Sequence, residues 1–416
     1  MIPIRSILRR VRTLLALGAP PALTLRVVIW FWGYVAREFA FQIVAGILVL
    51  VGVGALAGWP GGTIATVALA VLGGFLLVEL WFAWQSWRSA AAVDRELAEE
   101  VPGESAKSRF PRSHLYLPLL MFLPRGVIHR RGVVYHREER RRVRLDVYMP
   151  KAAARDDELR PAIVQIHGGG WIFGSRVEQG IPLLNHLAAN GWVGFNVDYR
   201  LSPRATMPDH VIDVKRAIAW VRENAEEYGV DPERICLTGG SAGGHLCALA
   251  ALTSEDRSLQ PGFEEADTSV SAAVAFYGLY DLLDAERRYY RHIRDWLIAR
   301  VVVKRDRDTD PDAFRKVSPT HRVHAGAPPF MVFHGEHDSL VPVGDARAFV
   351  ERLERISESP VLYVELPGSE HAFDLAPSLR CARVVEGIER FLRTVIDPPG
   401  ATVGQDMRDN ELQKVG

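Results

Sequence analysis

A serine flanked by glycines has the clearest potential for chemistry in this chain. Residues 239–243 read Gly-Gly-Ser-Ala-Gly and fit the pattern G-x-S-x-G. An apolar run of strand type precedes them at 234–238, and residues 245–252 have the composition of a buried helix. The pattern is typical of a sharp strand-to-helix turn that lifts a serine hydroxyl above a sheet. It predicts Ser241 as a nucleophile, with an ordinary glycine turn as the alternative.

Three consecutive glycines upstream supply a second chemical feature. Residues 167–171 read His-Gly-Gly-Gly-Trp and follow a predicted strand at 161–166. Without side chains, the backbone N–H groups of Gly168, Gly169 and Gly170 can point at one spot. An ester carbonyl becomes negatively charged when a serine attacks it, and preorganised N–H donors stabilise that charge. We therefore expect these glycines to form an oxyanion hole.

A serine nucleophile also needs a base, and the base needs a carboxylate that orients it. In an architecture of this kind the chain order is serine, then acid, then histidine. A predicted strand at 329–333 leads to Asp338, and a predicted strand at 361–366 leads to His371. Each side chain would lie in a loop just past a strand, where it can converge on Ser241.

Other ionisable residues lie near these loops. Glu336 is the alternative acid. His334 directly follows its strand and is interpreted as structural, and His337 lies beside the acid, before the next strand. Asp374 is interpreted as a loop or capping residue, and Asp198 precedes the serine, so the chain order favours a structural role. No H-x-x-x-H or H-E-x-x-H pair occurs, so we expect neither a metal nor another cofactor.

Several strings between about residues 133 and 396 together resemble one family. The chain there is similar to an α/β-hydrolase of the hormone-sensitive-lipase-like, H-G-G-G-W carboxylesterase type. The matching strings are 167–171, 198–202 (Asp-Tyr-Arg-Leu-Ser), 208–220, 239–244, 334–338 (His-Gly-Glu-His-Asp) and 371–373 (His-Ala-Phe). One departure is Met-Pro-Asp at 207–209, where such esterases often carry Phe-Pro-Ala. This difference is conservative.

The resemblance implies a fold and a set of roles. It implies an α/β-hydrolase fold, in which a mostly parallel central sheet is flanked by helices, with cap or lid insertions. It assigns Ser241 as nucleophile, Asp338 as acid and His371 as base. The resemblance also implies that backbone N–H groups of Gly169, Gly170 and Ala242 form the oxyanion hole.

An uncharged stretch precedes this domain. Residues 39–78 contain no formal charge and are interrupted by a turn signal, Gly-Trp-Pro-Gly-Gly, at 58–62. Each half has about 20 apolar residues, the length that crosses the hydrocarbon core of a bilayer. Tryptophans at 81, 84 and 87 follow, as an aromatic belt would. The sequence predicts a transmembrane helical hairpin over residues 38–88, with a buried helix pair as the alternative.

Arginines before the hairpin set its predicted orientation. Residues 1–37 carry six of them and no acidic residue. Because positive charge stays on the cytoplasmic side, both ends of the hairpin and the hydrolase domain are expected in the cytoplasm. Residues 27–36 are also apolar but short, so we interpret residues 1–37 as a basic, interfacial segment. If 27–36 instead spans the bilayer, the catalytic domain faces outward.

The rest of the chain divides around the catalytic domain. Residues 89–132 are predicted to be a linker and cap segment, 133–396 the catalytic domain with a lid insertion at about 282–325, and 397–416 a polar tail. The 50 basic and 50 acidic residues balance, which argues against a nucleic-acid partner. Three cysteines are too few for a disulfide framework.

These features together predict a membrane-anchored serine esterase or lipase. Its expected partners are a small-molecule or lipid ester and the lipid bilayer, and its reaction passes through an acyl-enzyme. The same triad would also serve an amide or formamide hydrolase, or a transacylase. A non-catalytic ligand-binding protein on a hydrolase fold is the alternative from another class.

Overall fold

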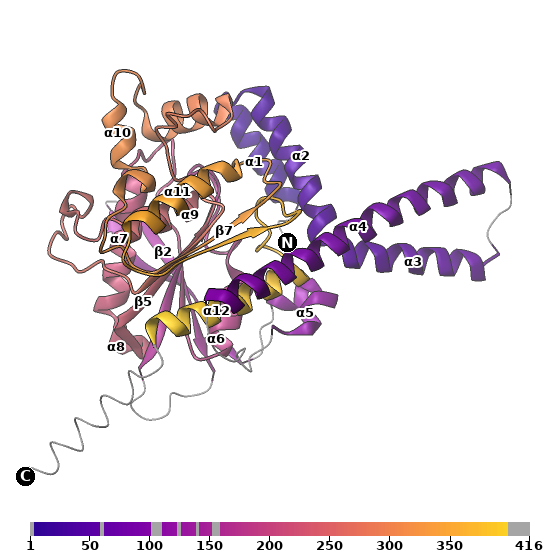
Figure 1. The fold of residues 1–416 in the computed structure, drawn as a ribbon, viewed down its shortest axis with the longest axis horizontal. Helices are drawn as coiled ribbons and strands as arrows, with labels where there is room; N and C mark the ends of the chain where they lie inside the picture. The colour runs from indigo at the N-terminus through magenta and orange to yellow at the C-terminus, as the bar shows by residue number, and fades with distance from the viewer. Residues whose placement is uncertain are drawn as a thin grey trace, which may run out of the picture.

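An eight-stranded sheet forms the centre of the molecule (Figure 1). The computed structural model describes residues 4–58, 62–100, 110–122, 126–138, 141–151 and 159–397. The strands are β1 (Val127–Glu138), β2 (Arg141–Pro150), β3 (Arg160–Ile166), β4 (Val193–Val197), β5 (Val230–Gly240), β6 (Ala272–Phe276), β7 (Phe330–Gly335) and β8 (Val361–Leu366). Their order is β1-β2-β4-β3-β5-β6-β7-β8. β2 runs in the direction opposite to the other seven strands, which are parallel to one another. The predicted mostly parallel sheet is therefore confirmed.

The burial of the strands explains their sequences. β6 and β7 are buried along their whole length. β6 is apolar throughout, and β7 is apolar from Phe330 to Phe333. This composition is typical of parallel strands that helices cover on both faces. β8 lies at the edge, and its residues alternate between half-buried and buried. The loops after β5, β7 and β8 all leave from the same edge of the sheet, because these strands are parallel.

Helices of the catalytic domain cover the sheet. They are α6 (Ile181–Ala189), α7 (Asp209–Glu223), α8 (Ala225–Tyr228), α9 (Ala242–Ala251), α11 (Val343–Ile356) and α12 (Leu379–Ile396). α6 and α12 contact each other, and α7 contacts α9. A short 3₁₀ turn, η2 (Arg257–Leu259), follows α9. The predicted lid insertion contains η3 (His292–Val303), wound as a π-helix, α10 (Pro311–Lys316) and η4 (Pro319–Arg322).

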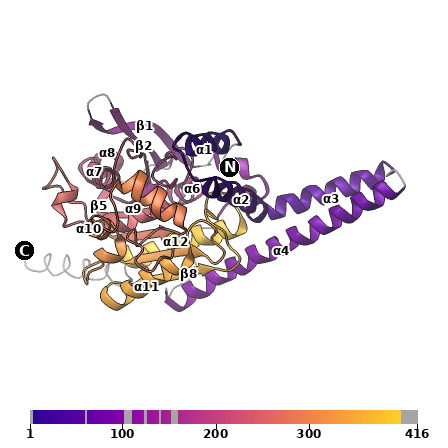
Figure 2. The same cartoon turned by 90° about the horizontal axis from the view of Figure 1, so that it is seen from above.

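The described residues up to 100 form four helices. They are α1 (Ile4–Ala16), α2 (Pro21–Glu38), α3 (Ala40–Leu56) and α4 (Thr63–Glu100). In both views α3 and the first half of α4 lie side by side and project away from the rest of the molecule, whereas α1 and α2 lie against it (Figures 1 and 2). The second half of α4 packs on α12 and β8. Of the predicted turn at 58–62, residues 59–61 lie outside the described residues.

Helix length and composition bear on the predicted membrane segment. Within the described part of the chain, one helical segment, Ala65–Ala98, is long and apolar enough to cross a bilayer, and almost none of its most apolar stretch is buried. α3 has 17 residues, and it passes the same test only together with α2, from which it is bent by 71°. One apolar helix is thus present, and a second span remains a proposal.

The predicted linker and cap segment, residues 89–132, begins within α4, where Ser89 donates a hydrogen bond to the Pro367 carbonyl in the loop after β8 at 2.6 Å. Between the end of α4 and the start of β1, its described part forms α5 (Arg112–Tyr116) and η1 (Pro118–Phe122). Asn185 of α6 donates a hydrogen bond to the Met121 carbonyl at 2.6 Å, which fixes η1 beside α6. The middle of the predicted linker, 101–109, and the predicted polar tail from residue 398 lie outside the described residues.

Candidate active site

Ser241 lies in the sharp turn between β5 and α9. Its φ and ψ of 59° and −121° are rare for a residue with a side chain. The flanking glycines make this turn sterically feasible. A Cβ atom at Gly239 would lie 2.5 Å from the Gly243 carbonyl oxygen, and one at Gly243 would lie 2.1 Å from the Ile166 oxygen. The turn has the strand-to-helix geometry that the glycine pattern predicts.

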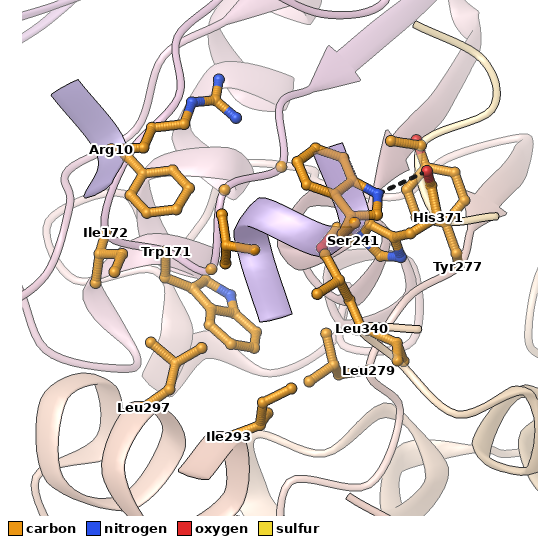
Figure 3. A pocket seen from close by; sticks show the side chains of 18 of the residues that line it. Arg10, Trp171, Ile172, Ser241, Tyr277, Leu279, Ile293, Leu297, Leu340 and His371 are labelled. Carbon is orange, nitrogen blue, oxygen red and sulfur yellow. Dashed lines mark hydrogen bonds between the residues drawn. The ribbon is translucent and has the colours of Figure 1, made fainter. Parts of the chain in front are cut away.

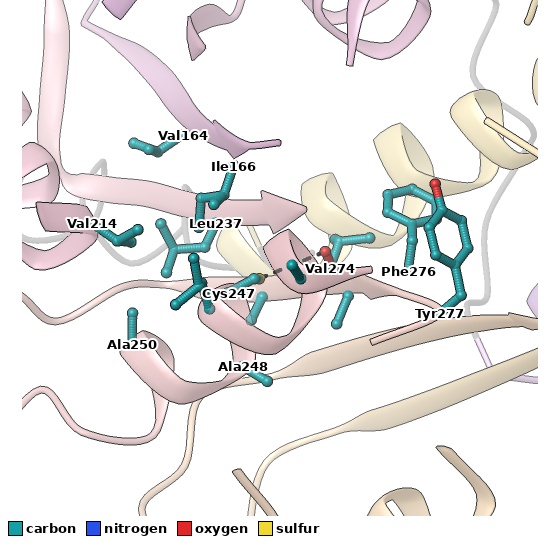
Figure 4. Close-up of a cluster of buried hydrophobic side chains, with 14 of the residues drawn as sticks. Val164, Ile166, Val214, Leu237, Cys247, Ala248, Ala250, Val274, Phe276 and Tyr277 are labelled. Atoms are coloured by element: carbon teal, nitrogen blue, oxygen red, sulfur yellow. Dashed lines mark hydrogen bonds between the residues drawn. The ribbon is translucent and has the colours of Figure 1, made fainter. Parts of the chain in front are cut away.

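A buried apolar cluster supports the turn from below (Figure 4). Cys247 and Ala248 of α9 pack with Leu237 of β5 and Val274 of β6, and all four are fully buried. Burial raises the pKa of the Cys247 thiol, and its sulfur donates a weak hydrogen bond to the Val274 carbonyl. A neutral thiol of this kind packs as a small apolar group. The helix that starts at Ser241 is therefore held rigidly on the sheet.

The predicted acid and base meet across two loops. We call residues 336–342, between β7 and α11, the acid loop, and residues 367–378, between β8 and α12, the base loop. His371 of the base loop donates from Nδ1 to Oδ2 of Asp338 in the acid loop at 2.6 Å, and both side chains are buried. The bond fixes the imidazole so that Nε2 remains for proton transfer.

Asp338 is surrounded by groups that favour its charged form. Its Oδ1 accepts hydrogen bonds from the backbone N–H groups of Leu340 at 2.9 Å and Val341 at 2.8 Å. Nε2 of His334 lies 3.3 Å from Oδ2. Burial by itself would raise the pKa of Asp338, but His371 and His334 outweigh it and hold that pKa well below its usual range. The carboxylate is therefore charged, as an orienting acid must be.

His334 thus has a more specific position than the sequence indicated. It was expected to be a structural loop histidine, and it is fully buried at the end of β7. Its Nε2 also lies 3.0 Å from the Val341 carbonyl, so it links the end of the strand to the acid loop. In the sequence, the indication of this contact was that His334 lies four residues before Asp338.

An apolar cavity of about 110 Å³ lies in front of Ser241 and His371. Figure 3 shows Ser241, His371 and Tyr277 on one side of the cavity, with Arg10 and Ile172 on the other. The lining includes Leu14, Leu23, Val27, Trp30, Trp171, Phe173, Leu279, Ile293, Leu297, Leu340, Val341 and Leu375. Ile293 and Leu297 belong to η3, so the insertion after β6 supplies one wall. A cavity with this lining suits an uncharged, apolar group.

The N-terminal helices form a wall that sequence reasoning missed. Leu14 of α1 and Leu23, Val27 and Trp30 of α2 line the cavity and are buried. Arg10 of α1 also lines the cavity, and its guanidinium pairs with Glu178 at 2.5 Å. The spacing of the α2 residues by four and three marks one helical face, but such a face fits a bilayer as well as a protein surface.

The loop after β3 has the conformation expected of a glycine-rich backbone site. Gly169 and Gly170 have φ of 123° and 58°, and a Cβ at Gly169 would lie 2.1 Å from the Phe173 oxygen. Both glycines line the cavity with Ser241. No hydrogen bond from the N–H groups of Gly169, Gly170 or Ala242 occurs within the described residues. These donors remain available to an oxyanion.

Gly168 differs from its predicted role. Its N–H group donates to Oε1 of Gln179 at 2.6 Å, in a buried contact. The amide is therefore already used, and Gly168 is corrected from an oxyanion donor to a residue that anchors the loop. A Cβ there would also lie 2.6 Å from the Gly240 oxygen. No sequence motif predicts this bond, because Gln179 belongs to a loop without a recognisable pattern.

Tyr277 and Asp374 are two further polar groups beside the base. The Tyr277 ring lies 4.4 Å from the His371 ring, and its hydroxyl donates to Asp374. Burial raises the pKa of Asp374 to about 6, against the opposing effect of that hydrogen bond. Asp374 was interpreted as a loop or capping residue. It lies in the base loop, and its side chain accepts the hydrogen bond from Tyr277.

The alternative candidates do not reach the base. Glu336 accepts a hydrogen bond from the Gly368 N–H at 2.8 Å, and His337 is half exposed beside it. Asp198 pairs with Arg176. α5 and η1, in the predicted cap segment, do not line the cavity. The structure thus brings together Ser241, Asp338 and His371, and leaves the alternatives apart.

Comparisons with known proteins agree with this geometry. A family model described as BD-FAE matches residues 145–353, half of the chain. The chain is 50% identical over 235 residues to the probable carboxylic ester hydrolase LipM of Mycobacterium tuberculosis, covering 56% of this chain and 54% of LipM. It is 44% identical over 274 residues to the esterase LipC of the same organism, covering 65% and 66%. The match spans about half the length of LipM.

Solved structures extend the comparison to the fold. Thermogutta terrifontis esterase 2 with bound butyrate has a TM-score of 0.54 and 29% identity, covering 67% of this chain and 96% of that chain. The same esterase phosphoramylated by tabun has a TM-score of 0.53 and 29% identity, covering 64% and 94%. The unmatched third of this chain is therefore additional to that esterase.

Proposed function

Because this chain belongs to the BD-FAE family of α/β-hydrolases, we propose that it is a serine esterase that hydrolyses carboxylic esters. The observation that carries the proposal is a single apolar cavity lined by Ser241 at a strained turn and by His371, which is bonded to a charged Asp338. The relatives named above are esterases, which favours esters over the amide, formamide and transacylase alternatives.

The mechanism follows from the positions of these groups. The Ser241 hydroxyl attacks the ester carbonyl while Nε2 of His371 takes its proton. Asp338 stabilises the resulting imidazolium, and the imidazolium then protonates the leaving alcohol. Water attacks the acyl-enzyme with the same histidine as base, which restores the serine.

The oxyanion is assigned to three backbone donors. Gly169, Gly170 and Ala242 provide N–H groups near Ser241 that have no other partner among the described residues. Such donors stabilise the charge on the attacked oxygen, and each is worth about 3 kcal/mol of barrier. Gly168 supports them through its bond to Gln179.

The proposed substrate is an ester with an uncharged, apolar acyl group. The cavity wall is made of Leu, Ile, Val and aromatic side chains, which favour apolar contacts. Among the described residues that line it, Arg10 is the one arginine or lysine, and it is paired with Glu178 and stacks on Phe173. A charged acyl group would find no counter-charge there.

Membrane anchoring is the second part of the proposal. The α3–α4 projection exposes large apolar side chains, which water disfavours and hydrocarbon accepts. α2 is bent by 71° from α3, and its outer face exposes Leu25, Ile29 and Trp32 at a spacing of four and three. An apolar helix face beside a spanning segment is typical of a helix at the bilayer surface. Both ends of the projection are proposed to be cytoplasmic.

Labelling and turnover of the full chain in detergent micelles test the esterase. We expect a fluorophosphonate probe to label Ser241 and the protein to hydrolyse p-nitrophenyl esters of apolar acids faster than the matched p-nitroanilides. Ser241→Ala and His371→Ala should each lower ester turnover by about 10³-fold or more. Ser258→Ala, an exposed serine remote from the cavity, is the control. Undiminished labelling of Ser241→Ala would place the nucleophile elsewhere.

A further inference from the structure

Helix α2 is bonded directly to the backbone of the proposed catalytic base. The indole N–H of Trp30 donates to the His371 carbonyl at 3.0 Å, the contact drawn dashed in Figure 3. Trp30 is only 5% exposed, and its ring stands edge-on to the imidazole at 6.3 Å between centroids. The residues are 341 positions apart. An N-terminal helix therefore reaches the middle of the base loop.

Glu370 connects this helix to both catalytic loops. Its Oε1 accepts hydrogen bonds from the N–H of His371 at 3.0 Å and from the N–H of Ser339 in the acid loop at 2.6 Å. Its Oε2 accepts from Nη1 of Arg37 of α2 at 3.0 Å. The Glu370 side chain is 5% exposed, so its charge requires this partner. The acid loop and the base loop are thus joined through one carboxylate.

The acid loop has its own contact with α2. Nη1 of Arg26 donates to the Ser339 carbonyl at 2.7 Å. Residues 26, 30 and 37 are separated by four and by seven, so they share one face of the helix. Arg26 contacts Ser339, the residue after the acid. Trp30 contacts the base, His371, and Arg37 contacts Glu370, the residue before the base. One helix face therefore follows the two loops that carry the acid and the base.

The end of α2 is fixed as well. Glu38 pairs with Arg380 at the start of α12, and both side chains are fully buried. Glu38 also accepts a hydrogen bond from Ser378, the last residue of the base loop, at 2.7 Å. Separating the partners of a buried ion pair strongly destabilises a protein, because it leaves a buried charge without a counter-charge. The pair therefore holds the end of α2 in one place.

We propose that α2 is a positioning element of the triad, acting through Trp30 and through the Arg37–Glu370 pair. The inference rests on the proposed function, because it takes His371 as the base. Its physical basis is that a general base works only at hydrogen-bond distance from the proton it removes. A displacement of about 1 Å can lower a rate about 10²-fold. The helix expected from sequence to lie only at the bilayer surface thereby becomes part of the active site.

Substitutions on two faces of α2 separate positioning from a general effect on the helix. Trp30→Phe keeps the ring and removes the N–H donor. Trp32→Phe is the matched control, because Trp32 is 63% exposed on the same helix. In full-length protein in micelles, we expect Trp30→Phe to lower kcat on p-nitrophenyl butyrate about tenfold, within the range that base catalysis supplies. KM should change less than twofold, and Trp32→Phe should leave both values unchanged.

Arg37 provides a second, independent arm if Trp30→Phe does not fold. Arg37→Gln removes the charge beside Glu370, and we expect kcat to fall with KM little changed. Arg37→Lys should restore most of the loss, because it restores the charge. The rate of fluorophosphonate labelling at Ser241 should follow kcat in every variant, since labelling also needs the base.

The outcomes distinguish the positioning role of α2 from the esterase activity on which it rests. Absence of labelling in the wild type would contradict the esterase itself. A labelled, active wild type in which Trp30→Phe and Arg37→Gln both retain kcat within twofold would overturn the positioning role alone. A rise in KM with kcat unchanged would also overturn it, because it would make α2 only a wall of the substrate cavity.

Discussion

Asp374 shows how the protein surroundings decide the charge of a single residue. Asp338 and Asp374 are both aspartates in the loops of the proposed active site; the Asp338 side chain is buried and Asp374 is half-buried. Asp338 has two histidines and two backbone N–H groups around it and stays charged. Asp374 has mainly the Tyr277 hydroxyl, so burial prevails and its pKa rises to about 6.

Replacing Asp374 by Asn should therefore stabilise the protein in a pH-dependent way. The folded pKa of about 6 exceeds the ordinary aspartate pKa of 3.8, so folding takes up a proton between these pH values. The contribution to stability is complete below about pH 4 and is lost as pH rises through 6. Asn keeps an acceptor for Tyr277 without the charge. We expect the melting temperature of Asp374→Asn to equal that of wild type near pH 4 and to exceed it increasingly up to pH 7.5.

The size of this effect follows from the shift. A rise in pKa from 3.8 to about 6 corresponds to at most about 3 kcal/mol in the free energy of unfolding above pH 6. Thermal unfolding in micelles at several pH values measures it. A difference in melting temperature that stays constant across the pH range would show that Asp374 does not titrate as assigned.

At the scale of elements, the loop after β3 combines two tasks. Gly168 and Gln179 anchor it, and Gly169 and Gly170 present free N–H groups to the cavity. Anchoring matters because an oxyanion donor stabilises charge only if it is already oriented. The loop between β3 and α6 is therefore as much part of the proposed chemistry as the turn at Ser241.

Gly169→Ala should disable this loop while the protein stays folded. The residue has φ of 123°, and the added Cβ would lie 2.1 Å from the Phe173 oxygen, so the backbone must move. We expect kcat on p-nitrophenyl butyrate to fall about 10²-fold, the loss typical of one oxyanion donor. Gly191→Ala is the matched control, since Gly191 also has positive φ, 95°, but nothing within 4 Å. Equal activity of the two variants in folded protein would make the loop an ordinary turn.

At the scale of the whole molecule, the N-terminal helices join a proposed membrane anchor to the catalytic domain. α2 has one face in the substrate cavity and another exposed to the surroundings. The second half of α4 packs through Val93 and Leu97, both buried. Removing residues 1–88 would therefore take away the wall that α1 and α2 contribute to the cavity.

Membrane topology can be measured with reporters at both ends of the full chain. We expect the protein to remain in membranes after carbonate extraction, and reporters at the N- and C-termini both to lie in the cytoplasm. This outcome requires two spans, because an even number returns the chain to its starting side. Reporters on opposite sides would mean that α4 alone spans the bilayer, or that residues 27–36 span it with α3 and α4. Extraction by carbonate would contradict anchoring altogether.

Much of the catalytic domain was predictable from its sequence alone. The glycines around Ser241, and the positions of Asp338 and His371 just past predicted strands, are local patterns. Such patterns are readable because each depends on a few consecutive residues: a strand, a turn that only glycine permits, and the residue that follows. The α/β-hydrolase fold was implied by the family resemblance that these motifs carry, and it is confirmed by the sheet order and the solved relatives.

Only the tertiary structure decided what lies around those residues. Trp30 meets His371, and Gln179 takes the N–H of Gly168, through contacts between segments that no local pattern connects. The apolar face of α2 has the same periodicity whether lipid or protein covers it. Hydrophobic burial has no direction and does not identify the covering surface. The sequence could therefore show that α2 has a face to bury, and only the folded chain could show that this face closes the active site.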